Sequence, residues 1–182
     1  MPTIVSHAVA AVALIVAFPE QAVPRRLALL GAACSMVPDI DVVGFRFGVH
    51  YADLLGHRGL THSLAFAATF ALAALLAAPR AHRGRVWLYL FLATASHGLL
   101  DAFTNGGLGV AFFSPFDTTR YFFSFTPIAV SPIGARFFSA RGVSVLLSEF
   151  QWVWLPSIAF AVAAFLLRRL ISPRIISNDQ PA

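Results

Sequence analysis

Five apolar runs, separated by polar or glycine- and proline-rich breaks, set the pattern of the chain. A helix that crosses a bilayer needs about 20 predominantly apolar residues. The first two runs are short for a full crossing and could instead form a re-entrant pair. The pattern predicts an all-α integral membrane bundle of about four to five transmembrane helices. The runs cover residues 3–18, 27–37, 61–78, 86–104 and 150–171.

Proline positions predict where the second run ends and how its neighbours lie. The residue before a proline disfavours the helical conformation, so we expect a helix end at Pro38. Asp39 and Asp41 then lie in an extended segment, where residues two apart point to the same side. Residues 42–59 are predicted to be a loop or short interfacial helices. Thr61 has the residue type of an N-cap for the third run.

The connection before the last run is long and interrupted. Residues 105–149 are rich in Phe, Pro, Gly and Ser. We predict that they form an interfacial loop, either a lid or a re-entrant stretch, with aromatic side chains at headgroup depth. We expect residues 1–172 to form a single membrane-embedded domain. The polar tail 173–182 is predicted to be disordered.

Composition agrees with a bilayer environment. The chain is 58% hydrophobic with a mean hydropathy of +0.77, and 12% of its residues are charged, against about 25% in soluble domains. The net charge is +5, but there is no lysine and the arginines lie mostly at the ends of apolar runs. This placement favours anchoring at lipid headgroups over nucleic-acid binding. The lipid bilayer is therefore an expected partner, and the single Cys34 excludes an intrachain disulfide framework.

Arginine positions predict an orientation in the bacterial inner membrane. If the five runs alternate sides, eight of the 13 Lys and Arg residues fall on short segments at one face, which the positive-inside rule makes cytoplasmic. The opposite, periplasmic face receives the N-terminus and residues 38–59 and 105–149. The eight are Arg25, Arg26, Arg80, Arg83, Arg85, Arg168, Arg169 and Arg174.

Histidines and aspartates gather at the predicted periplasmic face. His97 and Asp101 stand at i and i+4 and share a helix face. Imidazoles and carboxylates beside apolar runs are costly without partners. A divalent metal suits nitrogen and oxygen donors without thiolate, and Zn, Mn, Fe, Co and Mg all fit. The candidate ligands are His7, Asp39, Asp41, His57, His62, His97 and Asp101.

The ligand set also points to a reaction. Seven candidates exceed one tetrahedral site, so we expect more than one ion. Paired metals can activate a water and bind the oxygens of a phosphoryl group. Arg58 could bind a phosphate bidentately, or could instead anchor at headgroups or pair with Asp53. No nucleophile elbow, phosphate-binding glycine loop or HExxH pattern is present.

Each candidate also has a structural interpretation. His7 could be a hydrogen-bonded residue of an apolar helix. Asp39 and Asp41 could be solvated loop acids. Thr61 and Ser63 could orient ligands or cap a helix.

Several motifs resemble one known family. They are Ser-His at 6–7, Pro-Asp-Ile-Asp at 38–41, Gly-His-Arg-Gly-Leu-Thr-His-Ser at 56–63, Ser-His-x-x-x-Asp at 96–101, Thr-Asn-Gly-Gly at 104–107 and Pro-Phe at 115–116. The chain resembles the bacterial YdjM-type family, described as LexA-regulated, membrane-bound, metal-dependent hydrolases. That family is distantly similar to zinc-dependent phospholipase C and nuclease enzymes. The resemblance implies that all seven candidates bind metal and that the substrate is a phosphodiester or phospholipid.

We therefore expect a membrane-bound metal-dependent hydrolase with a metal-activated water, acting on a phosphoester or lipid-linked substrate at the periplasmic face. Zinc is favoured over Mn or Mg, and Arg58 and Asp41 are assigned catalytic roles. Two alternatives remain open. A metal ion transporter would spread its ligands across the membrane depth, near the midplane. A structural membrane protein would use the His and Asp side chains as a salt-bridged network.

Overall fold

The chain is helical apart from its connections in the computed structural model, which describes residues 1–132 and 137–171. Over those two ranges there is no β-strand, so the predicted all-α class is confirmed. In chain order, the elements are α1 (Ile4–Leu14), the 3₁₀ turns η1 (Ile15–Ala17) and η2 (Arg25–Leu27), α2 (Ala28–Met36), the 3₁₀-helix η3 (Val37–Phe47), the 3₁₀ turn η4 (Leu60–His62), α3 (Leu64–Ala74), the 3₁₀ turn η5 (Leu75–Ala77), α4 (Arg83–Ala102), α5 (Ala140–Glu149), the π-helical turn η7 (Phe150–Trp154) and α6 (Leu155–Ile171).

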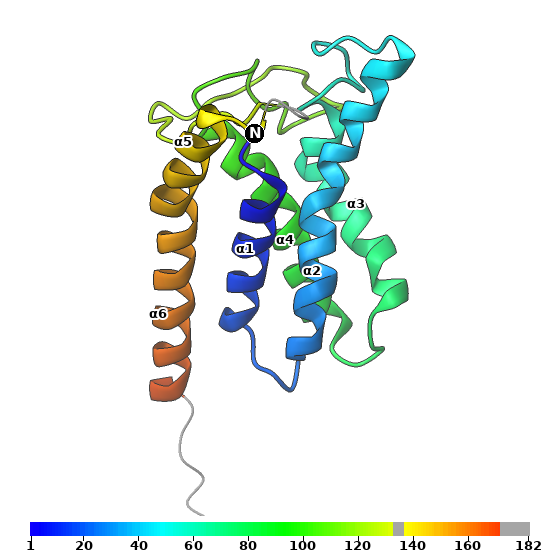
Figure 1. The fold of residues 1–182 in the computed structure, drawn as a ribbon. Coiled ribbons are helices and arrows are strands. Elements are labelled where there is room, and N and C mark those ends of the chain that lie inside the picture. Colours follow the sequence, from blue (N-terminus) through cyan, green and yellow to red (C-terminus); the bar gives the residue numbers. More distant parts are fainter. Residues whose placement is uncertain (133–136, 172–182) are drawn as a thin grey trace, which may run out of the picture.

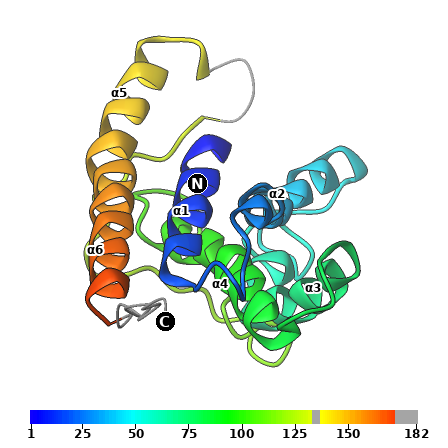
Figure 2. The ribbon, with the colours of Figure 1, turned by 90° about the horizontal axis from the view of Figure 1, so that it is seen from below.

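Helix α4 is the centre of the bundle. It packs against α1, α2 and α3, and α1 also packs against α2 (Figure 2). The long helix formed by α5, η7 and α6 lies on the outer side, where α6 contacts α1 and η1 (Figure 1). Most side chains of α6 are exposed, and none in this element is buried by the residues that the structure describes.

A close contact between α2 and α4 fixes their spacing. A Cβ placed on Gly31 of α2 would lie 2.0 Å from the hydroxyl oxygen of Tyr89 on α4. The fully buried Tyr89 donates a hydrogen bond to the carbonyl oxygen of Ala11 on α1, over 3.2 Å. Small residues at helix interfaces let backbones approach closely in membrane proteins. Gly31 therefore allows one tyrosine to join three helices.

Two helical stretches are long and apolar enough to cross a membrane. They are Arg25–Phe47 and Ala140–Ile171, with mean hydropathies of 1.6 and 1.8 over their most apolar windows. Only 6% of that window in Ala140–Ile171 is buried. Apolar surface on this scale is unusual for a soluble monomer. Two shorter apolar helices, Ile4–Ala17 and Leu64–Ala77, accompany them, and a count of four to five crossings remains a prediction.

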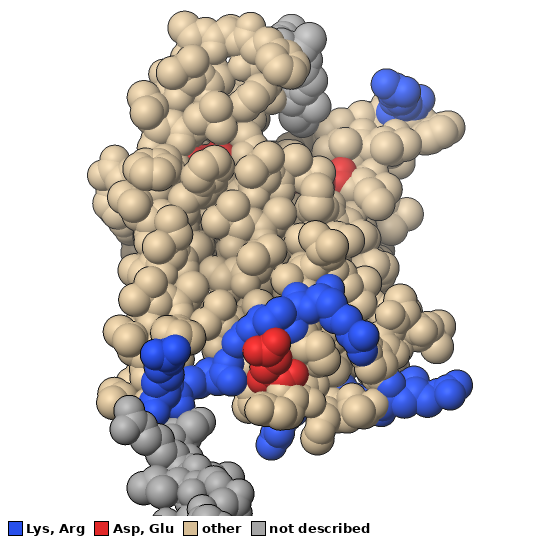
Figure 3. Space-filling view, turned by 60° about the horizontal axis from the view of Figure 1, so that its bottom comes forward, with Lys and Arg blue, Asp and Glu red and all other residues tan. Residues whose placement is uncertain are grey.

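The two ends of the bundle differ in character. One end carries the N-terminus, the turns of residues 48–59 and the connection after α4; we call it the site end (Figure 1). The other carries the connectors before α2 and α4 and the last turn of α6, and arginine side chains gather over it; we call it the arginine end (Figure 3). The predicted tail 173–182, including Arg174, lies outside the described residues.

Three predicted boundaries are wrong. The second helix does not end at Pro38, because this proline occupies the first turn of η3, where its missing N–H breaks no helical hydrogen bond. Helical structure instead continues to Phe47 and stops at Gly48, whose φ is 80°. Ser63, not Thr61, caps α3 by accepting a hydrogen bond from the Phe66 N–H over 3.0 Å. The last helix begins at Ala140, so part of the predicted interfacial loop is helical.

Candidate metal site

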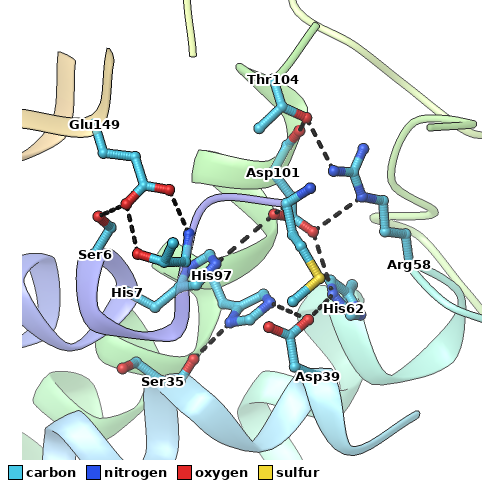
Figure 4. Close-up of polar contacts among 12 residues, drawn as sticks. Ser6, His7, Ser35, Asp39, Arg58, His62, His97, Asp101, Thr104 and Glu149 are labelled. Carbon is cyan, nitrogen blue, oxygen red and sulfur yellow. Dashed lines mark hydrogen bonds and ion pairs between the residues drawn. The ribbon is translucent and has the colours of Figure 1, made fainter. Parts of the chain in front are cut away.

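Four side chains from three elements converge at the site end. Asp39 comes from η3, His62 from η4, and His97 and Asp101 from α4 (Figure 4). Each offers one donor atom, and these atoms all lie within 4.8 Å of one another. The His97 Nε2 lies 3.2 Å from Asp39 Oδ1, and the His62 Nε2 lies 3.4 Å from Asp101 Oδ2. All four side chains are buried.

A second group shares His62. It contains Asp41, His57 and His62, again with donor atoms within 4.8 Å. The His57 Nδ1 lies 2.8 Å from Asp41 Oδ1, and the His62 Nδ1 lies 3.2 Å from Asp41 Oδ2. The Thr61 hydroxyl donates to the same Oδ2 over 2.6 Å. His62 therefore faces Asp41 at Nδ1 and the carboxylates of Asp39 and Asp101 at Nε2.

The 3₁₀ geometry of η3 explains why its two aspartates meet different nitrogens of His62. Such a helix has three residues per turn, so side chains two apart point about 120° away from each other. Asp39 therefore faces the Nε2 side of the ring and Asp41 faces the Nδ1 side. The prediction that both face one way in an extended segment is wrong, although both reach the same histidine. His97 and Asp101 share a face of α4 as predicted.

Arg58 is fully buried beside the first group. Its Nε lies 3.0 Å from Asp101 Oδ2, and its terminal nitrogens donate to the Thr104 hydroxyl over 2.9 Å and the Gly106 carbonyl over 2.8 Å. The predicted pairing with Asp53 and the predicted headgroup anchor are both wrong. The backbone φ of Arg58 is 63°, an uncommon conformation for a long side chain that is often found at functional sites.

His7 lies next to the first group without joining it. Its ring stacks on His97, with centroids 3.6 Å apart and planes 9° apart. The His7 Nε2 lies 3.8 Å from Asp101 Oδ1, and neither ring nitrogen has a hydrogen-bond partner. The interpretation of His7 as a hydrogen-bonded structural histidine is therefore wrong, and its role as a ligand stays a prediction.

Unpaired polar atoms and electrostatics indicate that the first group accommodates a cation. Within the part of the chain that the structure describes, the His62 Nε2, Asp39 Oδ2 and Asp101 Oδ1 are buried without a hydrogen-bond partner, while Asp101 Oδ2 is paired with Arg58. Each such atom costs about 1–3 kcal/mol if nothing satisfies it. Burial lowers the pKa of His62, but Asp101, Asp39 and Asp41 outweigh this effect and raise that pKa to about 10. A donor set of two imidazoles and two carboxylates around these atoms fits a divalent metal.

Sequence reasoning missed a buried glutamate near the site. Glu149 accepts hydrogen bonds from the backbone N–H and hydroxyl of Thr3 and, over 2.6 Å, from the Ser6 hydroxyl. Ser6 also accepts from the Trp154 indole N–H over 2.8 Å. The carboxylate thereby joins the start of α1, which carries His7, to η7 and the outer helix. The sequence signal for this role was the position of Glu149, a single acidic residue directly before the apolar run 150–171.

Comparison with known proteins identifies the family. Residues 1–173 match the family model described as "YdjM inner membrane protein". The chain is also 39% identical over 160 residues to the inner membrane protein YbcI of Escherichia coli (strain K12), covering 86% of this chain and 92% of that protein. No solved structure matches the chain. Neither description states an activity, but the family match spans nearly the whole chain: this protein belongs to the YdjM inner membrane protein family.

Proposed function

We propose that this protein is a membrane-bound, metal-dependent hydrolase that acts on a phosphoester or lipid-linked substrate at the periplasmic face of the bacterial inner membrane. The observation that carries the proposal is the buried group of Asp39, His62, His97 and Asp101. Its donor atoms converge and several lack any hydrogen-bond partner. Such a group is unfavourable in an apolar bundle unless a cation completes it.

In this proposal, those four side chains hold a divalent metal. Zinc is favoured because imidazole and carboxylate donors suit it, with Mn and Mg as alternatives. A bound metal would supply a water of lowered pKa and a Lewis acid for an ester or phosphoryl oxygen. The chain itself fixes the donors: Arg58 holds Asp101 through an ion pair of 3.0 Å, and burial keeps competing water away.

An open cavity offers the substrate a place beside the site. It has a volume of about 370 Å³ and is lined by both polar and aromatic residues. Two of its lining residues, Thr104 and Gly106, also accept hydrogen bonds from Arg58. A polar headgroup in this cavity would therefore lie next to the Arg58–Asp101 pair. The lining residues are Thr104, Asn105, Gly106, Gly107, Phe122, Phe123 and Thr126.

The arrangement of the ligands favours a hydrolase over an ion transporter. A transporter binds its ion near the bilayer midplane, with donors distributed along the path. Here the donors come from η3, η4 and the last turns of α4, all at the site end. In this proposal, the site end, which is formed by turns and connections, lies at the depth of the lipid headgroups. The position thus supports a substrate that resides in the membrane surface.

A structural His/Asp network is the second candidate, and the Arg58–Asp101 ion pair favours it. A network of this kind needs no metal, because Arg58 and a protonated His62 already balance part of the negative charge. The two candidates differ in what a chelator does. Chelation abolishes hydrolysis if the first proposal holds, and changes nothing if the network is purely structural.

The test is hydrolysis by the detergent-purified protein against phosphoesters, phospholipids and carboxylic esters, with zinc, manganese or magnesium restored. We expect activity on at least one class that is lost in His62→Ala and Asp101→Ala. Asp53→Asn is the matched control, because Asp53 is 53% exposed and contacts His50 instead of the buried group. Activity that survives both alanine variants, or no activity with any metal, would contradict the proposal.

A further inference from the structure

We propose that the seven candidate ligands divide by role: Asp39, His62, His97 and Asp101 bind one ion, while Asp41 is a positioning residue that orients His62 and His57. The division rests on the metal of the proposed function and replaces the expectation of two or more ions. It rests on the contacts of each possible metal-ligand atom, since some of these atoms are already hydrogen-bonded within the protein and others are not.

Both oxygens of Asp41 are engaged. Oδ1 accepts from the His57 Nδ1 over 2.8 Å, and Oδ2 accepts from the Thr61 hydroxyl over 2.6 Å and contacts the His62 Nδ1 at 3.2 Å. A carboxylate only accepts hydrogen bonds, so the ring nitrogens that face it carry protons. In the neutral form of His62, which is the form that binds a metal, the proton therefore sits on Nδ1 and Nε2 has the lone pair that a metal needs.

His97 also has its proton on Nδ1, but a different partner accepts the hydrogen bond from it. Its Nδ1 lies 2.6 Å from the carbonyl oxygen of Ser35, which also only accepts. The His97 Nε2 faces Asp39 Oδ1 at 3.2 Å, so a metal bound to this nitrogen takes the place of that contact. Metal-binding histidines almost always donate their second ring N–H to a carboxylate or a backbone carbonyl. His62 and His97 satisfy this rule independently, and both present Nε2 to the same space.

Asp39 and Asp101 contrast with Asp41 in their free oxygens. Among the described residues, Asp39 Oδ2 and Asp101 Oδ1 are buried without a hydrogen-bond partner and Asp101 Oδ2 is engaged through its ion pair with Arg58, whereas both Asp41 oxygens accept hydrogen bonds. Asp39 Oδ2, Asp101 Oδ1 and the His62 Nε2 have no hydrogen-bond partner among the described residues and can bind a cation, and the His97 Nε2 joins them by exchanging its contact with Asp39 Oδ1. The saturated Asp41 instead resembles the outer carboxylate of a carboxylate–histidine–metal arrangement.

The remaining two histidines lie outside this sphere. His57 directs Nδ1 at Asp41, and His7 stacks flat on His97 without joining the group whose atoms lie within 4.8 Å. One ion with two imidazoles and two carboxylates then accounts for the converging free donors.

Zinc titration of the full-length, detergent-purified protein tests the division. Wild-type protein and the exposed control Asp53→Asn should bind one zinc ion per chain. Asp41→Asn should still bind one ion at saturation, with the dissociation constant raised about 10- to 100-fold, as for other lost outer partners of ligating histidines. Asp39→Asn and Asp101→Asn should fall below one ion per chain at the same zinc concentration.

Cobalt substitution provides a second readout that a merely structural role would not move. The ligand-field absorption of bound Co²⁺ should keep its intensity in Asp41→Asn and change in Asp101→Asn. If Asp41→Asn does not purify in folded form, Thr61→Val replaces it, because it removes the hydroxyl that fixes Asp41 Oδ2. That variant should bind one ion with several-fold weaker affinity.

The outcomes separate the two claims. The division would be overturned if the wild type bound two ions and Asp41→Asn bound one. It would also be overturned if zinc affinity were unchanged in both Asp41→Asn and Thr61→Val. Either result would leave the proposed metal-dependent function standing. Wild-type protein that binds no zinc, cobalt or manganese would overturn the proposed function and the division together.

Discussion

Replacing Arg58 by methionine tests whether Asp101 is held by a buried charge. Methionine keeps much of the length of the side chain but removes the guanidinium, which pairs with Asp101 Oδ2 at 3.0 Å and donates to Thr104 and Gly106. Both partners of the ion pair have side-chain exposures of 0%. The substitution therefore leaves a carboxylate buried without its compensating charge.

The expected cost follows from that burial. Breaking a buried ion pair by removing one partner destabilises a protein by about 3–5 kcal/mol. For a chain of this size each kcal/mol corresponds to roughly 2–4 °C in Tm, so the metal-free variant should melt roughly 6–20 °C below the wild type. A bound divalent metal neutralises Asp101 in place of Arg58. The deficit should therefore shrink when zinc is present.

Thermal unfolding in detergent, with chelator and with excess zinc, measures both quantities. Arg46→Met is the matched control, because Arg46 is exposed at the end of η3 and should change the unfolding free energy by no more than about 0.5 kcal/mol. A metal-free Tm for Arg58→Met within 2 °C of the wild type, on the same scale of roughly 2–4 °C per kcal/mol, would refute the reasoning. A deficit that zinc leaves unchanged would show that Asp101 does not contact the ion.

Four further predictions follow from the fold. Gly31→Ala should lower stability by about 1–3 kcal/mol in thermal unfolding, because its Cβ would collide with Tyr89; an unchanged Tm would contradict that contact. Glu149→Ala should also lower the Tm, as it removes the acceptor for the start of α1, while Glu149→Gln should lose less. The pKa of His62 is raised from 6.5 to about 10, so the stability that its proton contributes to the metal-free protein is complete below pH 6.5 and lost as pH rises through 10. Melting curves in chelator at several pH values measure this decline, which His62→Gln should abolish. In a Cys34→Ser background, Asp53→Cys should react with an impermeant thiol reagent in intact spheroplasts, and Arg80→Cys only after permeabilisation; the reverse pattern would invert the proposed orientation.

The gathering of the site could be predicted from the sequence, because it depends on chain direction more than on detailed geometry. Alternating apolar runs bring the start of α1, the segment after α2 and the end of α4 to one end. The i, i+4 spacing of His97 and Asp101 then needs only a regular helix to place both inward. Six of the seven predicted ligands accordingly fall into the two converging groups.

The detailed partners could not be predicted, because they depend on backbone conformations without a clear sequence signal. The proline rule predicts a helix end at Pro38, yet Pro38 lies in the first turn of the 3₁₀-helix that turns Asp39 and Asp41 to different sides. Arg58 takes a left-handed conformation that directs it at Asp101, and nothing in the local sequence distinguishes this partner from the nearer Asp53. Glu149 meets Thr3 across 146 positions in the chain, a separation that local patterns do not encode.

Elemental analysis of the protein purified in detergent without added chelator is the most direct test of the central claim. The account predicts one bound divalent ion per chain, retained by Asp53→Asn and lost from Asp101→Ala. A wild-type preparation that carries no stoichiometric metal, and takes up none when zinc, manganese or cobalt is supplied, would contradict it.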